Sequence, residues 1–564
     1  MKNKINVTLI NPPHIPKDYV PQGLFVLKRQ LADRKRAFGD GHVKIIDLNI
    51  KYFNHAFLVE KSKVYCGRCC LRKKCSSKSF PLEDTIKLRE KIIECEEFIL
   101  REYLLNDAKL PIEREVNAIL TNSPGLVGFS IFNTVYAVSP YMAVSPFSTG
   151  QLTYSLALAK AIKERNRNIK IIFGGSSLYS IDQNQELMRF FSDIDFIVRG
   201  SGELALFDIV KTVAENSQRF DAIPNIIWRK DEDGGRIVQN KIVKPEKYEC
   251  SVPDYSGVDL SMYSPGGDVV ISGEKGKDLA LQKKSPRQEK ESFNEDVVLP
   301  IKLSSGCYWG KCKFCTFSKI SNHRRKTKKD IRRELSYYIN ELKIDKFTIC
   351  DESVPPEVFS DFADIIKKEK WKISYLGLAR PTKHFTEELL TKIYRSGCKI
   401  IFWGAETFSQ ELQRKVGKGL TVKDIQSTLI RSYDAGICNL IFGIYDLPFQ
   451  TKKTLEDDLQ FLDRNIKYIT QIAYQRFRLD RASLYFKDFN DEEILVPIFE
   501  KGPVCVNSLL CKWSSNKELV RYFNDNILPF VKNKTVSMSL NQLIRLLAKN
   551  SFLNSKNIRQ IKNL

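Results

Sequence analysis

The 564-residue sequence contains no apolar run that approaches the roughly 20 residues needed to cross a bilayer. The stretch from Met1 to Pro12 is too short and too polar for a secretory signal. No internal repeat is visible. These absences predict a cytoplasmic protein that has no membrane partner.

Acidic residues are outnumbered: 67 Asp and Glu face 90 Lys and Arg, which gives a formal charge of +23. Such an excess is compatible with an acidic partner, such as RNA, a phosphorylated substrate or an acidic peptide. The lysines are scattered rather than gathered in one stripe, which favours a solvated surface in a lysine-rich composition. We therefore do not expect nucleic acid as a partner.

The chain is too long for one core, and its 43% hydrophobic and 28% charged residues suit folded domains. Residues 1–265 alternate between strand-like and helical patterns. The strands are expected at 6–10, 43–48, 126–132, 169–173 and 195–198, with helices at 21–35, 152–165 and 204–215. This alternation predicts an α/β domain with a doubly wound, Rossmann-like sheet, whose ligands bind at the carboxyl ends of the strands.

Two segments interrupt the alternation. Residues 50–122 form an expected insertion with a group of cysteines and an amphipathic, helical stretch at 82–105. Residues 266–295 are charged and nearly free of aromatic residues, which predicts a flexible linker.

Residues 296–480 alternate again, and six strands are expected there. They lie at 299–303, 346–350, 372–376, 399–403, 440–443 and 472–477, with helices such as 328–342, 387–395 and 422–435 between them. Six such units predict a partial (βα)6, TIM-like barrel with its functional groups at the carboxyl ends of the strands. Residues 481–564 are less periodic and are expected to form a mostly helical tail.

Three cysteines follow the first barrel strand closely. Cys307, Cys312 and Cys315 form a C-x4-C-x2-C loop. Three thiolates at such spacing can hold three irons of a 4Fe–4S cluster and leave the fourth iron open to a small molecule. A zinc knuckle would need a fourth ligand, and the nearest residue of that kind, His323, lies eight residues beyond Cys315.

This loop resembles the cluster-binding motif of radical S-adenosylmethionine (radical SAM) enzymes, which mostly carry C-x3-C-x2-C. The extra residue lengthens the first arm of the loop without removing a ligand. The resemblance implies that Phe314 packs near the SAM adenine and that Asp351 and Glu352, after the second strand, bind the SAM amino group.

Later segments resemble the same family in order and spacing. Glu406 follows the fourth strand, where the family has a ribose-binding acidic residue. Arg380 could pair with the SAM carboxylate or form a salt bridge at the barrel rim. Gly443, Pro448 and Thr451 match a glycine- and proline-containing turn of the family only loosely.

The N-terminal domain resembles the cobalamin-binding domain of one radical SAM branch. The resemblance implies cobalamin contacts at Asn11, Pro12, Gly23, Ser130, Gly174, Gly175, Gly200, Gly202 and Glu203. The glycines would let the backbone approach a flat ligand. Because the string Asp-x-His-x-x-Gly is absent, we do not expect His14 to hold the cobalt. The alternative is a domain that kept its fold and lost its ligand.

The expected insertion holds Cys66, Cys69, Cys70 and Cys75 among four cationic residues. Four thiols could form a closed site for zinc or for a second iron–sulfur cluster. The adjacent Cys69 and Cys70 cannot easily both bind one ion, and Cys95 could substitute. The alternative is a set of unligated thiols.

The resemblance implies an enzyme that cleaves SAM to a 5′-deoxyadenosyl radical and methylates an unactivated carbon of a peptide or natural product. It would need a 4Fe–4S cluster, SAM, cobalamin and an electron donor such as flavodoxin or ferredoxin. Two alternatives stay open: a radical SAM enzyme that modifies a peptide or small molecule without methyl transfer, and a zinc-containing RNA-binding protein.

Overall fold

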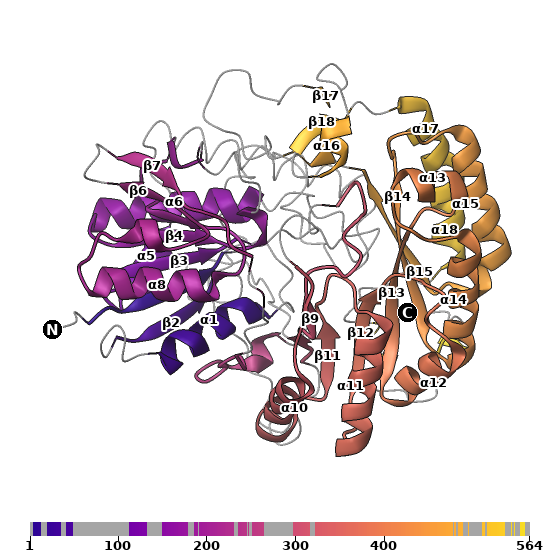
Figure 1. The fold of residues 1–564 in the computed structure, drawn as a ribbon, viewed down its shortest axis with the longest axis horizontal. Coiled ribbons are helices and arrows are strands. Elements are labelled where there is room, and N and C mark those ends of the chain that lie inside the picture. Colours follow the sequence, from indigo (N-terminus) through magenta and orange to yellow (C-terminus); the bar gives the residue numbers. More distant parts are fainter. Residues whose placement is uncertain are drawn as a thin grey trace, which may run out of the picture.

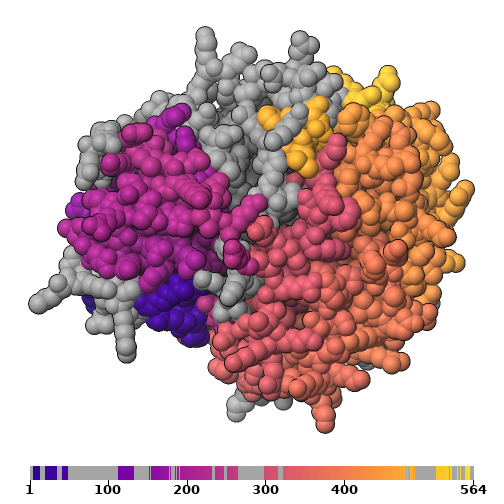
Figure 2. Space-filling view, viewed as in Figure 1, coloured from indigo at the N-terminus to yellow at the C-terminus, as the bar shows by residue number. Residues whose placement is uncertain are grey.

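The computed structural model describes two lobes that lie side by side (Figure 1). The described residues are 4–12, 20–34, 41–48, 112–131, 149–178, 191–230, 235–244, 251–263, 297–315, 322–477, 516–535 and 553–558, with short pieces between some of these ranges. The predicted linker at 266–295, the insertion cysteines and His14 lie outside them. Drawn as spheres, the N-terminal lobe, indigo to magenta, stands beside the barrel, red to orange (Figure 2).

The N-terminal lobe contains a seven-stranded sheet in the order β2-β1-β3-β4-β5-β6-β7. Its parallel strands are β2 (Val43–Asp47), β1 (Val7–Asn11), β3 (Leu126–Ser130), β4 (Lys170–Gly174) and β5 (Phe196–Val198). The strands β6 (Ile226–Lys230) and β7 (Arg236–Gln239) extend the sheet antiparallel. The Rossmann-like prediction is therefore confirmed, with an antiparallel edge added.

Helices cover both faces of this sheet because its buried strands are apolar on both sides. Ile171 and Phe173 belong to the core beneath α5 (Glu113–Leu120) and α6 (Thr149–Arg165). Ile172 belongs to the core beneath α1 (Gln22–Asp33) and α8 (Gly202–Ala214). Although α5 falls within the expected insertion of 50–122, it packs against α6 and so contributes to the core of the lobe.

The second lobe is a six-stranded parallel sheet in the order β8-β11-β12-β13-β14-β15. The strands are β8 (Leu299–Ile301), β11 (Lys346–Ile349), β12 (Ser374–Ala379), β13 (Cys398–Glu406), β14 (Cys438–Tyr445) and β15 (Gln471–Arg476). The helices α10 (Lys328–Ser336), α11 (Pro356–Glu369), α12 (Glu387–Arg395), α14 (Val422–Ala435) and α15 (Lys452–Asn465) connect them. The predicted partial barrel is confirmed.

The two faces of the barrel sheet contact different parts of the chain. Tyr375 and Trp403 point outward and share a core with the helices. Leu376 and Phe402, one residue away in the alternation, share a core with leucines of the C-terminal segment, among them Leu547. Ser555 fixes this segment at the strand beginnings, because its amide donates to Gly436 O (3.2 Å) and its hydroxyl to Tyr433 O (2.6 Å).

The end of the barrel segment and the tail contain strands that the sequence did not indicate. A small antiparallel sheet joins β16 (Leu479–Asp480), β18 (Leu510–Trp513) and β17 (Ile494–Leu495), followed by α17 (Lys517–Tyr522) and α18 (Leu528–Lys534). Strands this short carry no readable alternation. The expectation of a mostly helical tail therefore missed them.

The lobes share side-chain contacts near the start of α1. The Gln22 amide donates to Glu334 Oε1 (3.2 Å) and to the Tyr338 hydroxyl (3.3 Å) of the barrel lobe. The Tyr255 ring lies between Phe25 (4.6 Å) and Tyr338 (6.0 Å). Within the described residues, no helix has the length and apolar character that a membrane crossing requires.

Candidate active site

The cluster loop, residues 306–315, begins just beyond the first barrel strand. β9 (Ser304–Ser305) pairs with β10 (Arg324–Arg325), and Gly306 and Gly310 then turn the chain with φ of +79° and +64°. Cys312 is buried, and Cys307 and Cys315 are half-buried. Three thiols on one turn suit a 4Fe–4S cluster. Among the described residues, no group of three or more His, Cys, Asp or Glu side chains is arranged to hold a single metal ion.

Asp351 fixes the base of the cluster loop. Its carboxylate accepts hydrogen bonds from the amides of Leu303 and Ser304 (2.7 Å each) and from the Ser304 hydroxyl (2.6 Å). Burial raises the pKa of Asp351 to about 6. Its oxygens are thus engaged within the chain, and the geometry makes Asp351 an anchor of the loop; its contact with SAM stays a prediction.

Glu352 lies beside the first turn of the cluster loop. One carboxylate oxygen accepts from Lys302 Nζ (3.0 Å) and the other from the Gly306 amide (3.0 Å). The group therefore sits next to Cys307, where the predicted contact with the SAM ammonium requires it. That role stays a prediction.

Glu406 forms a buried ion pair that the sequence analysis did not find. It ends β13 with φ of +70°, and its Oε1 lies 2.6 Å from Lys418 Nζ. Lys418 Nζ also lies 5.7 Å from the centre of the Phe314 ring. Burial acts to lower the pKa of Lys418, but Glu406 and Cys312 outweigh it and raise that pKa. The structure thus brings together Phe314, Glu406 and the buried Cys312, with Lys418 between them.

A clamp from α15 and α13 (Gln410–Lys415) holds the turn after Glu406. Asp458 accepts from the Thr407 hydroxyl (2.9 Å) and the Phe408 amide (2.5 Å). Gln413 Nε2 donates to Ala405 O (2.7 Å) and to Thr407 O (2.5 Å). Burial raises the pKa of Asp458 to about 7. These contacts maintain a left-handed backbone that a glutamate rarely adopts.

Arg380 turns toward the aromatic residues of the cluster loop. Its guanidinium lies 4.1 Å from the Trp309 ring centre and 5.5 Å from that of Tyr308, and it donates to Lys418 O. The described residues contain no ion pair of Arg380, so the alternative of a rim salt bridge is not seen there. The contact of Arg380 with the SAM carboxylate stays a prediction. Trp309 is held in turn by Gly417 O, which accepts from its indole nitrogen at 2.9 Å.

The residues predicted to contact cobalamin lie at the carboxyl ends of the N-terminal strands or just beyond them. The Asn11 amide donates to Asp47 Oδ1 (3.0 Å), and Pro12 O accepts from Gln151 Nε2 (2.9 Å). Ser130 and Gly174 are partners in the register of β3 and β4. Gly202 and Glu203 begin α8, and Gly23 is exposed near the start of α1.

Different physical constraints explain the glycines at this edge of the sheet. At Gly175, with φ of +109°, a Cβ would lie 2.2 Å from Ile131 O, so the chain itself requires glycine there. At Gly200, with φ of +87°, a Cβ would meet nothing within 4 Å, and at Gly174 the nearest atom is Val198 Cβ at 3.9 Å. Gly23 likewise meets nothing within 4 Å, and at Gly202 the nearest atom is Leu27 Cδ2 at 3.7 Å. Of these glycines, Gly175 alone lacks room for a Cβ, and the other four leave space that suits a flat ligand.

Residues 301–462 match the family model described as the Radical SAM superfamily. An uncharacterized methyltransferase of Pyrococcus horikoshii is 23% identical over 323 residues, which are 56% of this chain and 62% of that protein. The chain therefore spans less than two thirds of the length of that relative.

Solved structures are similar across both lobes. The methyltransferase TsrM of Kitasatospora setae, solved with cobalamin and a [4Fe-4S] cluster, is 14% identical with a TM-score of 0.59, covering 97% of this chain and 96% of that one. The cobalamin-dependent SAM radical enzyme OxsB, solved with aqua-cobalamin and SAM, is 15% identical with a TM-score of 0.58, covering 91% of this chain and 65% of that one. The fold is shared, and residues 301–462 form a radical SAM domain, as the cysteine loop predicted.

Proposed function

We propose that this chain is a cobalamin-dependent radical SAM enzyme that methylates an unactivated carbon of a peptide or natural product. The observation that carries the proposal is the position of Cys307, Cys312 and Cys315 beyond the first strand of a partial barrel, beside a Rossmann-like lobe. The names of the similar proteins, two methyltransferases and a cobalamin-dependent radical enzyme, support it.

When bound, the reduced cluster supplies the electron that splits SAM into methionine and a 5′-deoxyadenosyl radical, and cobalamin supplies the methyl group. The side chains of this protein would bind SAM and orient it. Glu352 would accept hydrogen bonds from the SAM ammonium and Glu406 from the ribose hydroxyls. Lys418 donates one N–H to Glu406 and has further N–H groups that would donate to the SAM carboxylate. Phe314, near Lys418, would pack against the adenine.

Radical chemistry also requires that water be kept from the barrel interior. Leu543, Leu547, Leu553 and Ile558 pack on the inner face of the sheet at the strand beginnings. We assign the C-terminal segment the role of closing that end of the barrel.

The cobalamin would lie at the carboxyl edge of the N-terminal sheet. Gly174 and Gly200 leave open space there, and Asn11 is fixed by Asp47. Asn11, Pro12, Gly23, Ser130, Gly175, Gly202 and Glu203 stay proposed contacts of the same site.

The division of the chain is part of the proposal: a cobalamin domain at 1–265, a linker at 266–295, the barrel at 296–480 and a tail at 481–564. A cytoplasmic flavodoxin or ferredoxin would supply the electron. Cys66, Cys69, Cys70 and Cys75 would hold zinc or a second cluster.

The test is anaerobic reconstitution with iron, sulfide and hydroxocobalamin, followed by metal analysis and mass spectrometry of SAM cleavage. About four irons per chain mean one cluster, and about eight implicate the insertion. The variant in which the three loop cysteines become alanine should lose cluster and 5′-deoxyadenosine together. If it still releases 5′-deoxyadenosine, the proposal is wrong.

A second candidate keeps the radical chemistry without methyl transfer. It is favoured by Gly175, which the contact with Ile131 explains without any ligand. One equivalent of bound cobalamin and a product heavier by one methylene would exclude it. The zinc-containing RNA-binding alternative predicts zinc without acid-labile sulfide, and RNA binding that weakens with salt.

A further inference from the structure

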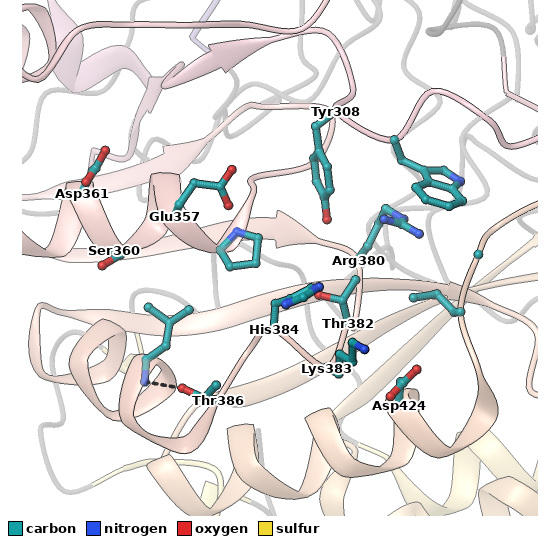
Figure 3. Close-up of a pocket in the computed structure, with 15 residues that line it drawn as sticks. Tyr308, Glu357, Ser360, Asp361, Arg380, Thr382, Lys383, His384, Thr386 and Asp424 are labelled. Carbon is teal, nitrogen blue, oxygen red and sulfur yellow. Dashed lines mark hydrogen bonds between the residues drawn. The ribbon is translucent and has the colours of Figure 1, made fainter.

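A cavity of about 900 Å³ lies between the cluster loop and the first turns of three barrel helices. Figure 3 shows Tyr308 on one side of the cavity and the loop that follows β12 on another. Trp309, the neighbour of Tyr308 in the sequence, also lines it. Of the described residues that line it, none is a loop cysteine, Phe314, Glu352 or Glu406. Of the residues predicted to contact SAM, Arg380 alone is among the described residues that line the cavity.

A buried cation lines this cavity, and no carboxylate of the described residues forms an ion pair with it. Arg380 is only 5% exposed, its Nε has no hydrogen-bond partner, and no described carboxylate pairs with it. Its other contacts are the carbonyl of Lys418 and the faces of Trp309 and Tyr308. Because a guanidinium stays ionised at any working pH, its burial here is costly until an anion approaches.

Other donors surround Arg380. Thr382 Oγ1 is buried without a partner, and Lys383 and His384 line the same wall. Figure 3 places Thr382 and His384 opposite Tyr308, with Lys383 beside them. A ligand in the cavity could thus accept hydrogen bonds from more than one side.

The acidic residues of the cavity already have partners. Glu357 pairs with Arg325, and Asp361 Oδ1 lies 2.8 Å from Lys328 Nζ. Asp424 accepts from the Thr421 hydroxyl at 2.7 Å. Cations therefore match the charges of Glu357 and Asp361, whereas Asp424 is engaged only by a neutral hydroxyl and no described carboxylate matches the charge of Arg380.

Three helices begin at this cavity, namely α11, α12 and α14. The side chain of Thr386 caps α12 and that of Thr421 caps α14, whereas α11 begins after Pro355 without a side-chain cap. The amino ends of helices attract anions through their free N–H groups and their dipoles. Acidic residues in the first turn offset this effect in all three helices: Glu357 in α11, Glu387 and Glu388 in α12, and Asp424 in α14. The side chains of the cavity therefore matter more for an anion than the helix ends do.

We propose that this cavity, the Arg380 pocket, binds a phosphorylated small molecule, with a phosphate oxygen on Arg380 Nε and another on Thr382 Oγ1. A phosphate suits donors that come from several directions, and guanidinium–phosphate hydrogen bonds are charge-assisted. The ligand would also fix Tyr308 and Trp309, which lie between Cys307 and Cys312. This site goes beyond the proposed methyl transfer and does not depend on it.

The test is anaerobic calorimetry of the reconstituted full chain with pyrophosphate, inorganic phosphate and acetate. Pyrophosphate and phosphate should bind, and acetate should bind at least about tenfold more weakly. R380M should weaken pyrophosphate binding about tenfold or more, and T382V by a few fold. K453M, which removes an exposed lysine of α15, is the matched control and should bind like the parent.

Three results would overturn the proposal: no binding of either phosphate probe, equal binding by R380M and the parent, or acetate as tight as phosphate. Competition is the fourth check. If saturating SAM displaces pyrophosphate, Arg380 belongs to the SAM site and the separate pocket does not exist. Thermal melts show whether R380M is folded; where it is not, R380K and T382V decide, and T382V must still weaken pyrophosphate.

Discussion

The packing of the cluster loop can be tested at a residue that touches no cofactor. Gly419 has φ of +64°, and a Cβ built there would lie 2.1 Å from the Trp309 ring. The ring cannot yield without leaving Gly417 O and Arg380, which hold it on two sides. We therefore expect G419A to displace Trp309 and, with it, the first arm of the cluster loop.

The magnitude follows from these contacts. An alanine held in the left-handed backbone conformation of Gly419 lowers the stability of the fold by about 1–2 kcal/mol. Loss of the indole hydrogen bond adds about 1 kcal/mol, and loss of the cation–π contact adds roughly 0.5–2 kcal/mol. G419A should thus lower the free energy of unfolding of the barrel by about 2.5–5 kcal/mol. G257A is the matched control, because Gly257 has φ of +76° and a Cβ there would meet nothing within 4 Å; it should cost only about 1–2 kcal/mol.

The assay is urea denaturation of both variants, with iron per chain measured after anaerobic reconstitution and gel filtration. G419A should lose stability and iron, whereas G257A should keep its iron. Equal destabilisation of the two variants, with iron intact in both, would refute the argument that Trp309 and Gly419 position the loop.

Three further predictions concern the barrel. K418M should lower the free energy of unfolding by about 3–5 kcal/mol, because it leaves Glu406 buried without a cation. The double variant E406Q/K418M should recover much of that stability in thermal melts. If it does not, the ion-pair argument is contradicted. Asp458 has a pKa raised above its unfolded value, so the folded state binds the extra proton and the free energy of unfolding should fall as pH rises from about 4 to about 7; D458N should lack this slope in pH-dependent denaturation. L547A should destabilise the barrel by about 2–5 kcal/mol in denaturation, because the C-terminal segment shares its inner core, and a change near zero would show that the segment is not seated there.

Much of the fold could be predicted because it depends on local pattern. Apolar runs located the strands, and β11, expected at 346–350, is observed as Lys346–Ile349. The cysteine loop was placed because strand, turn and ligands are consecutive in sequence. The short strands of the tail could not be found, since two residues such as Leu479 and Asp480 carry no periodicity.

Long-range contacts explain what the sequence did not reveal about the site. Lys418 and Glu406 are twelve residues apart on different elements, and no motif marks a lysine as the partner of a given carboxylate. Asp458 acts on the turn after Glu406 from a helix that begins only beyond the next strand, β14. The sequence did contain a signal for Asp458, because an aspartate at a buried helix position needs hydrogen-bond donors. Those donors must come from another helix, strand or loop.

The hydrogen-bond partners of the acidic residues after β11 distinguish a ligand contact from a residue that only holds the loop in place. Asp351 and Glu352 are neighbours after β11, and the resemblance assigned both to one SAM group. In the structure the Asp351 side chain contacts the loop base, and that of Glu352 contacts its first turn. Asp351 accepts three hydrogen bonds from the chain, whereas Glu352 spends one oxygen on an amide and one on a partly exposed lysine. A ligand can displace the lysine of Glu352 at little cost, but it cannot take the oxygens of Asp351 without leaving two backbone amides unpaired, and Glu352 is therefore the better candidate for the SAM ammonium.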